Sequence, residues 1–526
     1  MHLKVIAFLL YISVWPNHVE ASAYSDIPNS CGLFDELGLT STQQAQLEEN
    51  LGGINLDDLS VLDPLERSSV ACTIASIVFG PKFINQSASS YEDVVEENWS
   101  NTCWLRPQCA IQPELAQDVA KAMAILTFLD TKFSVRSGGH NPNPGFAGVG
   151  KEGILIDMSN MTHISLNEGG SIASLSPGNR FGGVAKSLNS IGRAVHGGRN
   201  NQVGIGGYFL GGGLTYFNSL YGLAADNVVN YEVVLANSSI INANAHENQD
   251  LWWALKGSGT NFGIVTKYDV KVTANSPYWF EALNYAPDQI PTLLQAIVKY
   301  AVAAEEEPYA DISFNLNPSQ AFVAFIYAEP VVRPNVFKMF YDIPPKSQAI
   351  NSTIGNMMDL NNAMSNITPE RHLRWALIRT KLLDDIYGAY AEFDSVAQSI
   401  GAVTGMTVQP FTSAAVRHGL WTGGNPVGLT ETLQNHMEFF IQWGDSDNDE
   451  AAVAALQSIT AKVETLAQQR GAYLKSKIMN DAGFYQNVLA SYGPENLSRL
   501  RDVAVRYDPL QVFQNLQNDG FLLRKN

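Results

Sequence analysis

The order of apolar and polar residues predicts a strand, a helix and a second strand between positions 109 and 136. A short apolar run is followed by a helix that opens at Pro113, because proline suits the first helical turn. The apolar face of this helix would be formed by Val119, Ala122, Met123 and Leu126. Alternation resumes over 132–136 and stops at the run Ser137-Gly138-Gly139-His140. The segment predicts a β-α-β unit that ends in a glycine turn.

Strands and helices are mixed along the rest of the chain, without strict alternation. The pattern predicts strands in GILIDMS and SIASLSPG, helices in FGGVAKSLNSIG and ENQDLWWALKG, and a hairpin that turns at Asn237-Ser238. After about position 275, aromatic and β-branched strands such as DISFNLN, AFVAFIYAE and MEFFIQWG alternate with helices. This mixture favours an α+β fold over a doubly wound parallel sheet. Because a single core stops growing near roughly 250–300 residues, the 526-residue chain is expected to form at least two domains.

The N-terminus has the features of an export signal. Lys4 precedes an apolar run over 5–15, and small residues near Ala21 offer a cleavage site. The run is too short to span a membrane, and no later stretch approaches about 20 apolar residues. We therefore expect a signal peptide over 1–21 and a secreted protein without a membrane anchor; a buried N-terminal strand is the alternative.

Cysteines and glycosylation sequons agree with export. The four cysteines all lie in the first fifth of the chain, and an even number in an oxidising compartment indicates two disulfides of undetermined pairing. A zinc site is the alternative, but these cysteines lack Cys-x-x-Cys spacing, so no metal is expected. The cysteines are Cys31, Cys72, Cys103 and Cys109. Sequons that predict N-glycans occur at Asn85, Asn98, Asn160, Asn237, Asn351, Asn366 and Asn496.

Net charge and missing motifs exclude several functions. A net charge of −18 argues against a nucleic-acid partner, which needs a basic surface. The sequence has no Gly-x4-Gly-Lys-Ser/Thr phosphate loop, no Gly-x-Ser-x-Gly elbow and no His-Glu-x-x-His motif. One Gly-x-Gly-x-x-Gly run occurs over 148–153, but it leads into a strand rather than a helix. A nicotinamide-binding Rossmann site is therefore not expected.

Three glycine-rich turns stand close together in the sequence, in RSGGH, VHGGRNNQVGIGGYFLGGG and GSGTNFGIVT. Any one of them could serve only as a tight turn. Together they offer more free backbone N–H groups than tight folding requires, and such groups bind anions. We therefore expect a large anionic cofactor.

The three turns lie within a set of six motifs that follow one another along the chain: RPQCAIQP, VRSGGH, GILIDMSNM, HGGRNNQVGIGGYFLGGG, YGLAADNVVNYEVVLA and DLWWALKGSGTNFGIVTKYDV. With the C-terminal stretch YGPENLSRLRDVAVRYDPLQVFQ, the sequence resembles FAD-linked oxidases of the vanillyl-alcohol-oxidase superfamily, in the berberine-bridge-enzyme-like group. The resemblance implies an α+β fold in which a PCMH-type FAD-binding domain, built from N- and C-terminal segments, carries an inserted α+β substrate domain on an antiparallel sheet. The expected segments are an N-terminal segment 22–103, the FAD domain 104–275, the substrate domain 276–475 and a returning segment 476–526.

The resemblance also assigns cofactor residues. In this family the turn Ser137-Gly138-Gly139 binds the FAD pyrophosphate, and the histidine, here His140, is bonded to the flavin 8α carbon. Members with a second bond use a cysteine in Gly-x-Cys-x-x-Val-Gly, where this chain has Asn200. No cysteine follows Cys109, so a single covalent bond is expected. The other residues assigned to FAD are Arg136, Gly198, Val203, Gly204, Gly206, Gly207, Gly263, Ile264, Val265 and Asn480.

The catalytic base is left open. Many family members carry Tyr-x-Asn-Tyr where this chain has Ile478-Met479-Asn480-Asp481, so the tyrosine base is missing. Alternation in NHMEFFIQW places His436, Glu438, Phe440 and Gln442 on one face of a strand. Glu438, His436 and Tyr485 are the candidates, and an ordinary outward polar face is the alternative.

The resemblance implies a secreted FAD-dependent oxidoreductase that acts on a small specialised metabolite, with hydride passing to FAD and O2 accepting the electrons as H2O2. The alternatives are a carbohydrate oxidase of the same fold and a secreted binding glycoprotein without catalysis. The resemblance further implies a Cys72–Cys109 disulfide, which leaves Cys31 to pair with Cys103.

Overall fold

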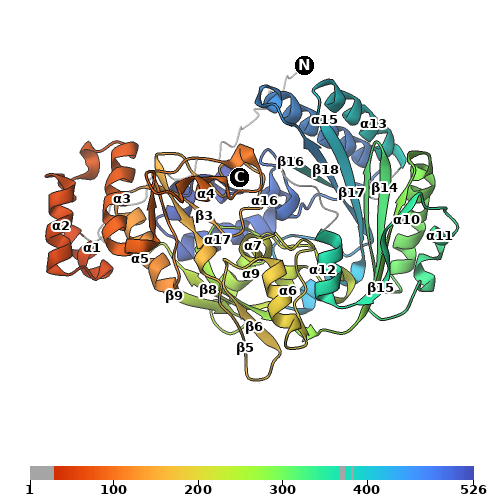
Figure 1. Cartoon of the computed structure of the whole chain (residues 1–526), viewed down its shortest axis with the longest axis horizontal. Helices are drawn as coiled ribbons and strands as arrows, with labels where there is room; N and C mark the ends of the chain where they lie inside the picture. Colours follow the sequence, from red (N-terminus) through yellow and green to blue (C-terminus); the bar gives the residue numbers. More distant parts are fainter. Residues whose placement is uncertain (1–28, 366–373, 381–383) are drawn as a thin grey trace, which may run out of the picture.

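The computed structural model describes residues 29–365, 374–380 and 384–526. The expected signal peptide and the sequon at Asn366 lie outside these residues. None of the described helices combines the length and apolar character that crossing a membrane requires. Figure 1 shows the remaining chain as a helical N-terminal part, a central mixed region and a large sheet covered by helices.

A four-stranded sheet contains the predicted β-α-β unit. Its strand order is β1-β2-β4-β3, and β2 and β3 both pair parallel to β4. Helix α5 joins β2 to β3 and begins at Ala116, later than the predicted Pro113, because Asp118 accepts hydrogen bonds from the N–H groups of Glu114 and Leu115. The bounds are β1 (Phe83–Asn85), β2 (Cys109–Ile111), α5 (Ala116–Phe128), β3 (Lys132–Arg136) and β4 (Gly153–Asp157).

N-terminal helices pack on this sheet, and the end of the chain returns to it. Helices α1 and α3 contact α5. The N–H of Phe133 in β3 donates to the carbonyl of Leu516 at 3.0 Å, and the N–H of Asn518 donates back to the carbonyl of Phe133 at 2.7 Å. The N-terminal helices are α1 (Ser30–Leu37), α2 (Ser41–Leu51), α3 (Pro64–Phe79) and α4 (Tyr91–Glu96). Of the C-terminal helices, α18 (Val512–Asn515) packs in the core of this sheet, whereas α16 (Val488–Ser491) and α17 (Pro494–Tyr507) pack in the core of the five-stranded sheet described next.

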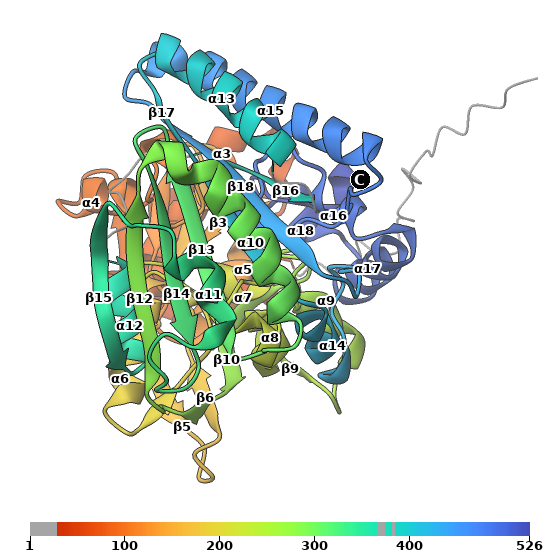
Figure 2. The same ribbon diagram turned by 90° about the vertical axis from the view of Figure 1, so that its right-hand side faces the viewer.

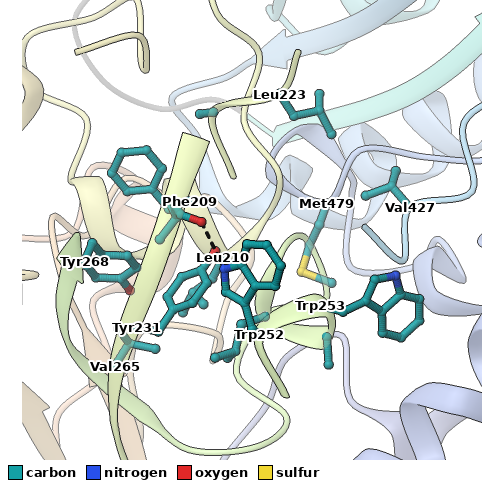
Figure 3. Packing of buried hydrophobic residues seen from close by; sticks show 14 of the residues in the cluster. Phe209, Leu210, Leu223, Tyr231, Trp252, Trp253, Val265, Tyr268, Val427 and Met479 are labelled. Carbon is teal, nitrogen blue, oxygen red and sulfur yellow. Dashed lines mark hydrogen bonds between the residues drawn. The ribbon is translucent and has the colours of Figure 1, made fainter. Parts of the chain in front are cut away.

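A five-stranded antiparallel sheet follows, in the order β5-β6-β10-β8-β9. The predicted hairpin is β8–β9, and Ser238 in its turn has a φ of +64°. Figure 3 shows Tyr231, Tyr268, Phe209 and Trp252 packed together in the core that supports this sheet. The bounds are β5 (Ile164–Leu166), β6 (Ile172–Leu175), α6 (Phe181–Asn189), β7 (Arg193–Ala194), α7 (Ile205–Leu210), α8 (Asn218–Tyr221), β8 (Val228–Val234), β9 (Ile240–Asn244), α9 (Gln249–Leu255), β10 (Ile264–Lys271) and β11 (Thr273–Ala274).

The third sheet has seven antiparallel strands in the order β15-β12-β14-β13-β17-β18-β16. Helices α10, α11, α13 and α15 cover one face, and the opposite face is turned toward α6 and α7 (Figures 1 and 2). The strands are β12 (Tyr278–Tyr285), β13 (Ala310–Asn317), β14 (Gln320–Tyr327), β15 (Ser347–Gly355), β16 (Arg374–Thr380), β17 (Val403–Phe411) and β18 (Gln434–Gln442). The helices are α10 (Ile290–Ala304), α11 (Lys338–Tyr341), α12 (Met357–Ser365), α13 (Asp384–Ser399), α14 (Ser413–Trp421) and α15 (Asp449–Gln469). The expected α+β architecture is confirmed.

One of the two expected disulfides is present. Cys72 of α3 and Cys109 of β2 are bonded, with their Cα atoms 6.0 Å apart. The second expected bridge is wrong, because no disulfide joins Cys31 to Cys103. Cys31 is exposed in α1, which packs on α5, whereas Cys103 is buried with its Sγ 3.6 Å from the carbonyl of Asn141. The two cysteines thus contact different parts of the fold, whereas a disulfide needs a Cα separation of roughly 4.4–6.8 Å.

One predicted glycan site is buried. Asn98 is 3 % exposed, and its Nδ2 donates to the carbonyl of Cys103 at 3.1 Å. A glycan on this nitrogen would displace that bond and has no room, so the prediction for Asn98 is wrong for the folded protein. The sequon asparagines that lie exposed are Asn85, Asn160, Asn237 and Asn351.

Candidate active site

A cavity of about 730 Å³ lies between the glycine turns and the face of the seven-stranded sheet opposite α10, α11, α13 and α15. The turns that line it are 137–140, 203–211 and 259–265. Side chains from β13, β14, β17 and β18 form the opposite wall. The cavity thus joins two parts of the chain that are far apart in sequence.

The first two turns meet backbone to backbone. A Cβ on Gly138 would lie 2.5 Å from the Cα of Gly204, so neither position tolerates a side chain. Ser137 fixes the contact, because its Oγ donates to the carbonyl of Pro177 at 2.5 Å and accepts from the N–H of Gly206 at 3.2 Å. Gly139 has a φ of +65°, a conformation that suits glycine. The result is a cavity surface made by the closely packed backbones of these two turns, which we call the glycine floor.

The third turn packs closely against β8. A Cβ on Gly263 would lie 2.5 Å from Cγ1 of Val233, and the strand that carries Ile264 and Val265 begins directly after it. The hydroxyl of Tyr268, further along β10, donates to the carbonyl of Gly206 at 3.1 Å. This bond ties the second and third turns together under the cavity.

His140 stands at the end of the first turn and lines the cavity. Its imidazole is stacked on the indole of Trp99, with ring centroids 4.7 Å apart and planes 13° from parallel. Burial, with a smaller effect of the positive charge on Arg180, lowers the pKa of His140 to about 4. The imidazole is therefore neutral near pH 7 and keeps a nitrogen lone pair.

Across the cavity, three ionisable side chains meet, His436 and Glu438 from β18 and Asp481 from the segment Met479–Asp481. Glu438 and Asp481 line the cavity, whereas His436 is 1 % exposed and lies behind them. Nε2 of His436 is 3.2 Å from Oε1 of Glu438 and 3.1 Å from Oδ2 of Asp481. The intervening residues Met437 and Phe439 point into the core under the covering helices.

The two carboxyl groups differ in their affinity for a proton. Burial and the charge of Asp481 raise the pKa of Glu438. Burial is also the largest single effect on Asp481 and acts to raise its pKa, but hydrogen bonds with His436 and Glu438 and the charges of His436 and Arg199 together outweigh it, so the pKa of Asp481 is lowered. A proton taken up from the cavity is therefore held on Glu438 in preference to Asp481.

Arg199 adds a cation to the same wall. It lies between β7 and α7, lines the cavity, and donates through Nη1 to Oε1 of Gln409 in β17 at 2.6 Å. Nε2 of Gln409 is 3.3 Å from Oδ2 of Asp311, whose pKa is raised by burial. The positive charge of Arg199 opposes the upward pKa shifts of Asp311 and Glu438.

The remainder of the sheet wall combines amides and hydroxyls with apolar side chains. Oγ1 of Thr407 donates to Oδ1 of Asn315 at 2.7 Å, and Nδ2 of Asn315 lies 3.3 Å from Oγ of Ser313. Phe322 and Phe440 lie among these polar groups. Such a wall can hydrogen-bond an oxygen-bearing ligand and pack against a ring.

Comparison with known proteins decides the family. Residues 107–244 match the model of an FAD binding domain. An FAD-dependent monooxygenase of Arthrobotrys oligospora is 35 % identical over 505 residues, which cover 93 % of this chain and 98 % of the relative. The chain belongs to the FAD-dependent oxidoreductases of the vanillyl-alcohol-oxidase superfamily.

Solved structures agree on the fold of this oxidoreductase. The berberine-bridge-enzyme-like 1 protein of Physcomitrella patens superimposes with a TM-score of 0.70 at 18 % identity, covering 83 % of this chain and 96 % of that one. Glucooligosaccharide oxidase from Acremonium strictum, described as carrying 6-S-cysteinyl, 8α-N1-histidyl FAD, superimposes with a TM-score of 0.69 at 17 % identity, covering 83 % and 97 %.

Most residues that the sequence assigned to FAD line the cavity of the oxidoreductase, and the close-packed glycine floor is the surface that a large flat cofactor requires. These residues are Ser137, Gly138, Gly139, His140, Val203, Gly204, Gly206, Gly207, Gly263, Ile264, Val265 and Asn480. The residues present therefore fit FAD.

Two assigned residues do not line the cavity. The guanidinium of Arg136 is turned away from it, 3.1 Å from Oδ2 of Asp157 and 2.5 Å from the carbonyl of Val94. Gly198 lies under Phe181, where a Cβ would come within 2.5 Å of the ring. Neither residue is placed at the cavity wall, so their direct contact with the cofactor stays a prediction.

Asn480 lines the cavity but is engaged with the second turn. Its Oδ1 accepts from the N–H of Gly213 at 2.8 Å, and its Nδ2 donates to the carbonyl of Tyr208 at 3.2 Å. Asn480 thereby fixes the shape of the turn that follows α7.

The structure separates the three candidate bases. Glu438 lines the cavity and His436 backs it, but Tyr485 is not among the lining residues. The hydroxyl of Tyr485 lies 3.3 Å from Oγ1 of Thr460 in α15, on the helix-covered side of the sheet.

Sequence reasoning missed Asp481, Arg199 and Trp99. Asp481 had a usable signal, because it occupies the position of the second tyrosine in the family's Tyr-x-Asn-Tyr. An ionisable residue that replaces a catalytic one is itself a candidate. No comparable signal marked Arg199 or Trp99.

Proposed function

We propose that this FAD-dependent oxidoreductase is a secreted oxidase that removes hydride from a small specialised metabolite, with Glu438 as the base. The observation that carries the proposal is the contact of Glu438 and His436 on β18 with Asp481, across the cavity from the glycine turns that fit FAD. A base in this place can take a proton from a substrate held between the two walls.

The residues around the cavity have separate roles in the proposed reaction. When bound, FAD supplies the hydride acceptor, and O2 takes up the electrons as H2O2. Glu438 accepts the proton of the substrate hydroxyl or amine, and its raised pKa suits this task. His436 holds the Glu438 carboxyl in place and is itself oriented by Asp481. Phe322 and Phe440 offer apolar rings against which the substrate can pack.

We further propose that FAD is attached to the protein by one bond, between an imidazole nitrogen of His140 and the 8α carbon. Forming this N–C bond would release one proton from the imidazole nitrogen and one from the 8α carbon, and FAD would supply the two-electron acceptor, with O2 as the final oxidant giving H2O2. The neutral imidazole of His140 supports this step, because it retains the attacking lone pair. Asn200 lines the cavity where doubly tethered relatives carry cysteine, and an amide offers no thiolate.

A carbohydrate oxidase remains the second candidate. The hydrogen-bonded row Ser313, Asn315 and Thr407 favours it, since a sugar presents several hydroxyls to such a wall. The specialised-metabolite proposal is supported by the 35 % identity to a fungal FAD-dependent monooxygenase along nearly the whole chain. The glucooligosaccharide oxidase shares only 17 % identity, which supports the fold alone.

Oxygen uptake by the purified yellow protein separates the candidates. We expect consumption of O2 with phenolic or alicyclic alcohols and none with oligosaccharides, and one H2O2 formed for each substrate oxidised. Uptake with oligosaccharides alone would replace the proposal by the second candidate. Incorporation of ¹⁸O from ¹⁸O2 into the product would show a monooxygenase and refute the oxidase mechanism.

Secretion and N-glycosylation are part of the proposal. They are supported by the N-terminal export features and by the exposed sequon residues Asn85, Asn160, Asn237 and Asn351. We expect the protein in the culture medium of a eukaryotic host to begin after residue 21 and to lose mass on endoglycosidase treatment. Retention of the full chain inside the cell would contradict this part.

A further inference from the structure

Trp99 is the aromatic partner of the residue proposed to carry FAD. The indole of Trp99 and the imidazole of His140 are stacked at 4.7 Å with planes 13° apart, and both side chains line the cavity. Rotation of a histidine ring about its Cβ–Cγ bond is otherwise broad. A flat partner at stacking distance restricts this rotation and fixes the plane of the imidazole.

Trp99 is held in position by its own segment. Its backbone N–H donates to the carbonyl of Gly139 at 2.9 Å, directly beside His140. On the preceding residue, Nδ2 of Asn98 donates to the carbonyl of Cys103 at 3.1 Å, and the carbonyl of Asn98 accepts from Nε1 of Trp104 at 2.8 Å. Trp99 is therefore bonded through its backbone to the turn that carries His140, in addition to stacking on the imidazole.

The positive charge of Arg180, which acts on His140, has an anionic partner in the same segment as Trp99. Arg180, whose charge acts on His140, forms an ion pair with Glu97, two residues before Trp99. Arg180 also donates through Nη1 to the carbonyl of Gln202 at 2.5 Å, which holds its guanidinium beside the second turn. The segment 97–99 thus supplies the charge partner of Arg180 and the stacking partner of His140.

We propose that Trp99 is a positioning residue for the attachment of FAD, holding the imidazole of His140 in the plane from which its nitrogen reaches the 8α carbon. The inference rests on the covalent bond proposed above and adds to it the residue that sets its geometry. The indole takes no part in bond formation, so its effect falls on the rate of attachment and leaves the final bond unchanged.

The test compares a substitution that removes the flat ring with one that keeps it. Trp99→Leu retains apolar volume without a ring, whereas Trp99→Phe retains a smaller flat ring. Each protein is purified with bound FAD, and attached flavin is followed over time as fluorescence that survives acid precipitation. Total flavin per chain and the melting temperature are measured on the same samples.

We expect attachment in Trp99→Leu to be slowed by up to about 100-fold, the loss that misplacing a reacting group by about 1 Å can cause. Trp99→Phe should attach FAD at a rate near that of the unchanged protein. Attachment in Trp99→Leu at the unchanged rate, or equal slowing in both variants, would overturn the proposal. Trp99→Met serves in place of Trp99→Leu if the latter does not fold.

A His140→Ala control separates this inference from the proposal on which it rests. Acid-stable flavin on His140→Ala would refute the tether itself. If His140→Ala lacks attached flavin while Trp99→Leu attaches it at the full rate, only the role of Trp99 is refuted.

Discussion

The carboxylate of Glu438 lies 3.2 Å from Nε2 of His436, two residues earlier on the same strand. Side chains two apart on a strand share a face, so β18 itself brings these groups together. Only Glu438 of the pair lines the cavity. In the proposed mechanism, Glu438 is therefore the group that meets the substrate, and His436 holds the Glu438 carboxyl in place.

Glu438→Gln should abolish proton acceptance while it preserves side-chain size. We expect the rate of flavin reduction to fall by about 10²- to 10⁴-fold, the usual contribution of a positioned base. Rapid-mixing absorbance of the flavin measures this rate without involving O2. Glu431→Gln, which changes an exposed glutamate paired with Arg417, is the matched control and should reduce flavin at the normal rate. A normal rate in Glu438→Gln would exclude this residue as the base.

Asp481→Asn should shift the pH dependence of the reaction. Burial is the largest cause of the raised pKa of Glu438, and the negative charge of Asp481 is the second largest. Removing that charge stabilises the Glu438 carboxylate, so its pKa falls and the acidic limb of kcat/KM moves to lower pH. Steady-state profiles of the variant, with exposed Asp502→Asn as control, measure the shift. A shift to higher pH would contradict this account of the pair.

Acid should destabilise the protein through His196. This residue is buried, stacked on Tyr221 at 3.7 Å, and burial lowers its pKa to about 3. The ordinary pKa of histidine is about 6.5. As the pH falls from about 6.5 toward 3, the unfolded chain therefore takes up a proton that the folded protein does not, and stability decreases.

We expect His196→Gln to lose less stability than the unchanged protein between pH 7 and pH 4, although it is less stable at pH 7. Denaturant unfolding at several pH values measures the difference, with exposed His163→Gln as control. Parallel pH curves for His196→Gln and the unchanged protein would show that this histidine is not the cause.

The Cys72–Cys109 disulfide should contribute substantially to stability. It closes a loop of 37 residues, and such a bridge typically contributes about 2–4 kcal/mol. We expect the Cys72→Ser/Cys109→Ser double variant to unfold at a lower denaturant concentration. Cys31→Ser, at an exposed position, should leave the midpoint unchanged. Peptide mapping under non-reducing conditions that linked Cys31 to Cys103 would contradict the structure.

Local sequence patterns were sufficient to predict many of the secondary-structure elements and to locate the glycine turns. The strand ending at Arg136 and the hairpin around Ser238 follow from alternation and turn residues within a few positions. Gly138 and Gly204 were recognised by the family motifs, but the reason for glycine became visible only in the fold. A Cβ at either position would collide with the other backbone.

The sequence by itself determined the α+β architecture, the FAD-binding turns and the Cys72–Cys109 pairing, because each is marked by a local pattern or by a motif of the family. The tertiary structure decided which ionisable groups meet. His436 and Asp481 are 45 positions apart, and Tyr485, only four residues after Asp481, points to the other side of the sheet. It also placed Trp99 on His140 and turned Arg136 away from the cavity. Such contacts depend on how the sheets and turns pack across large sequence separations, and no local pattern records that packing.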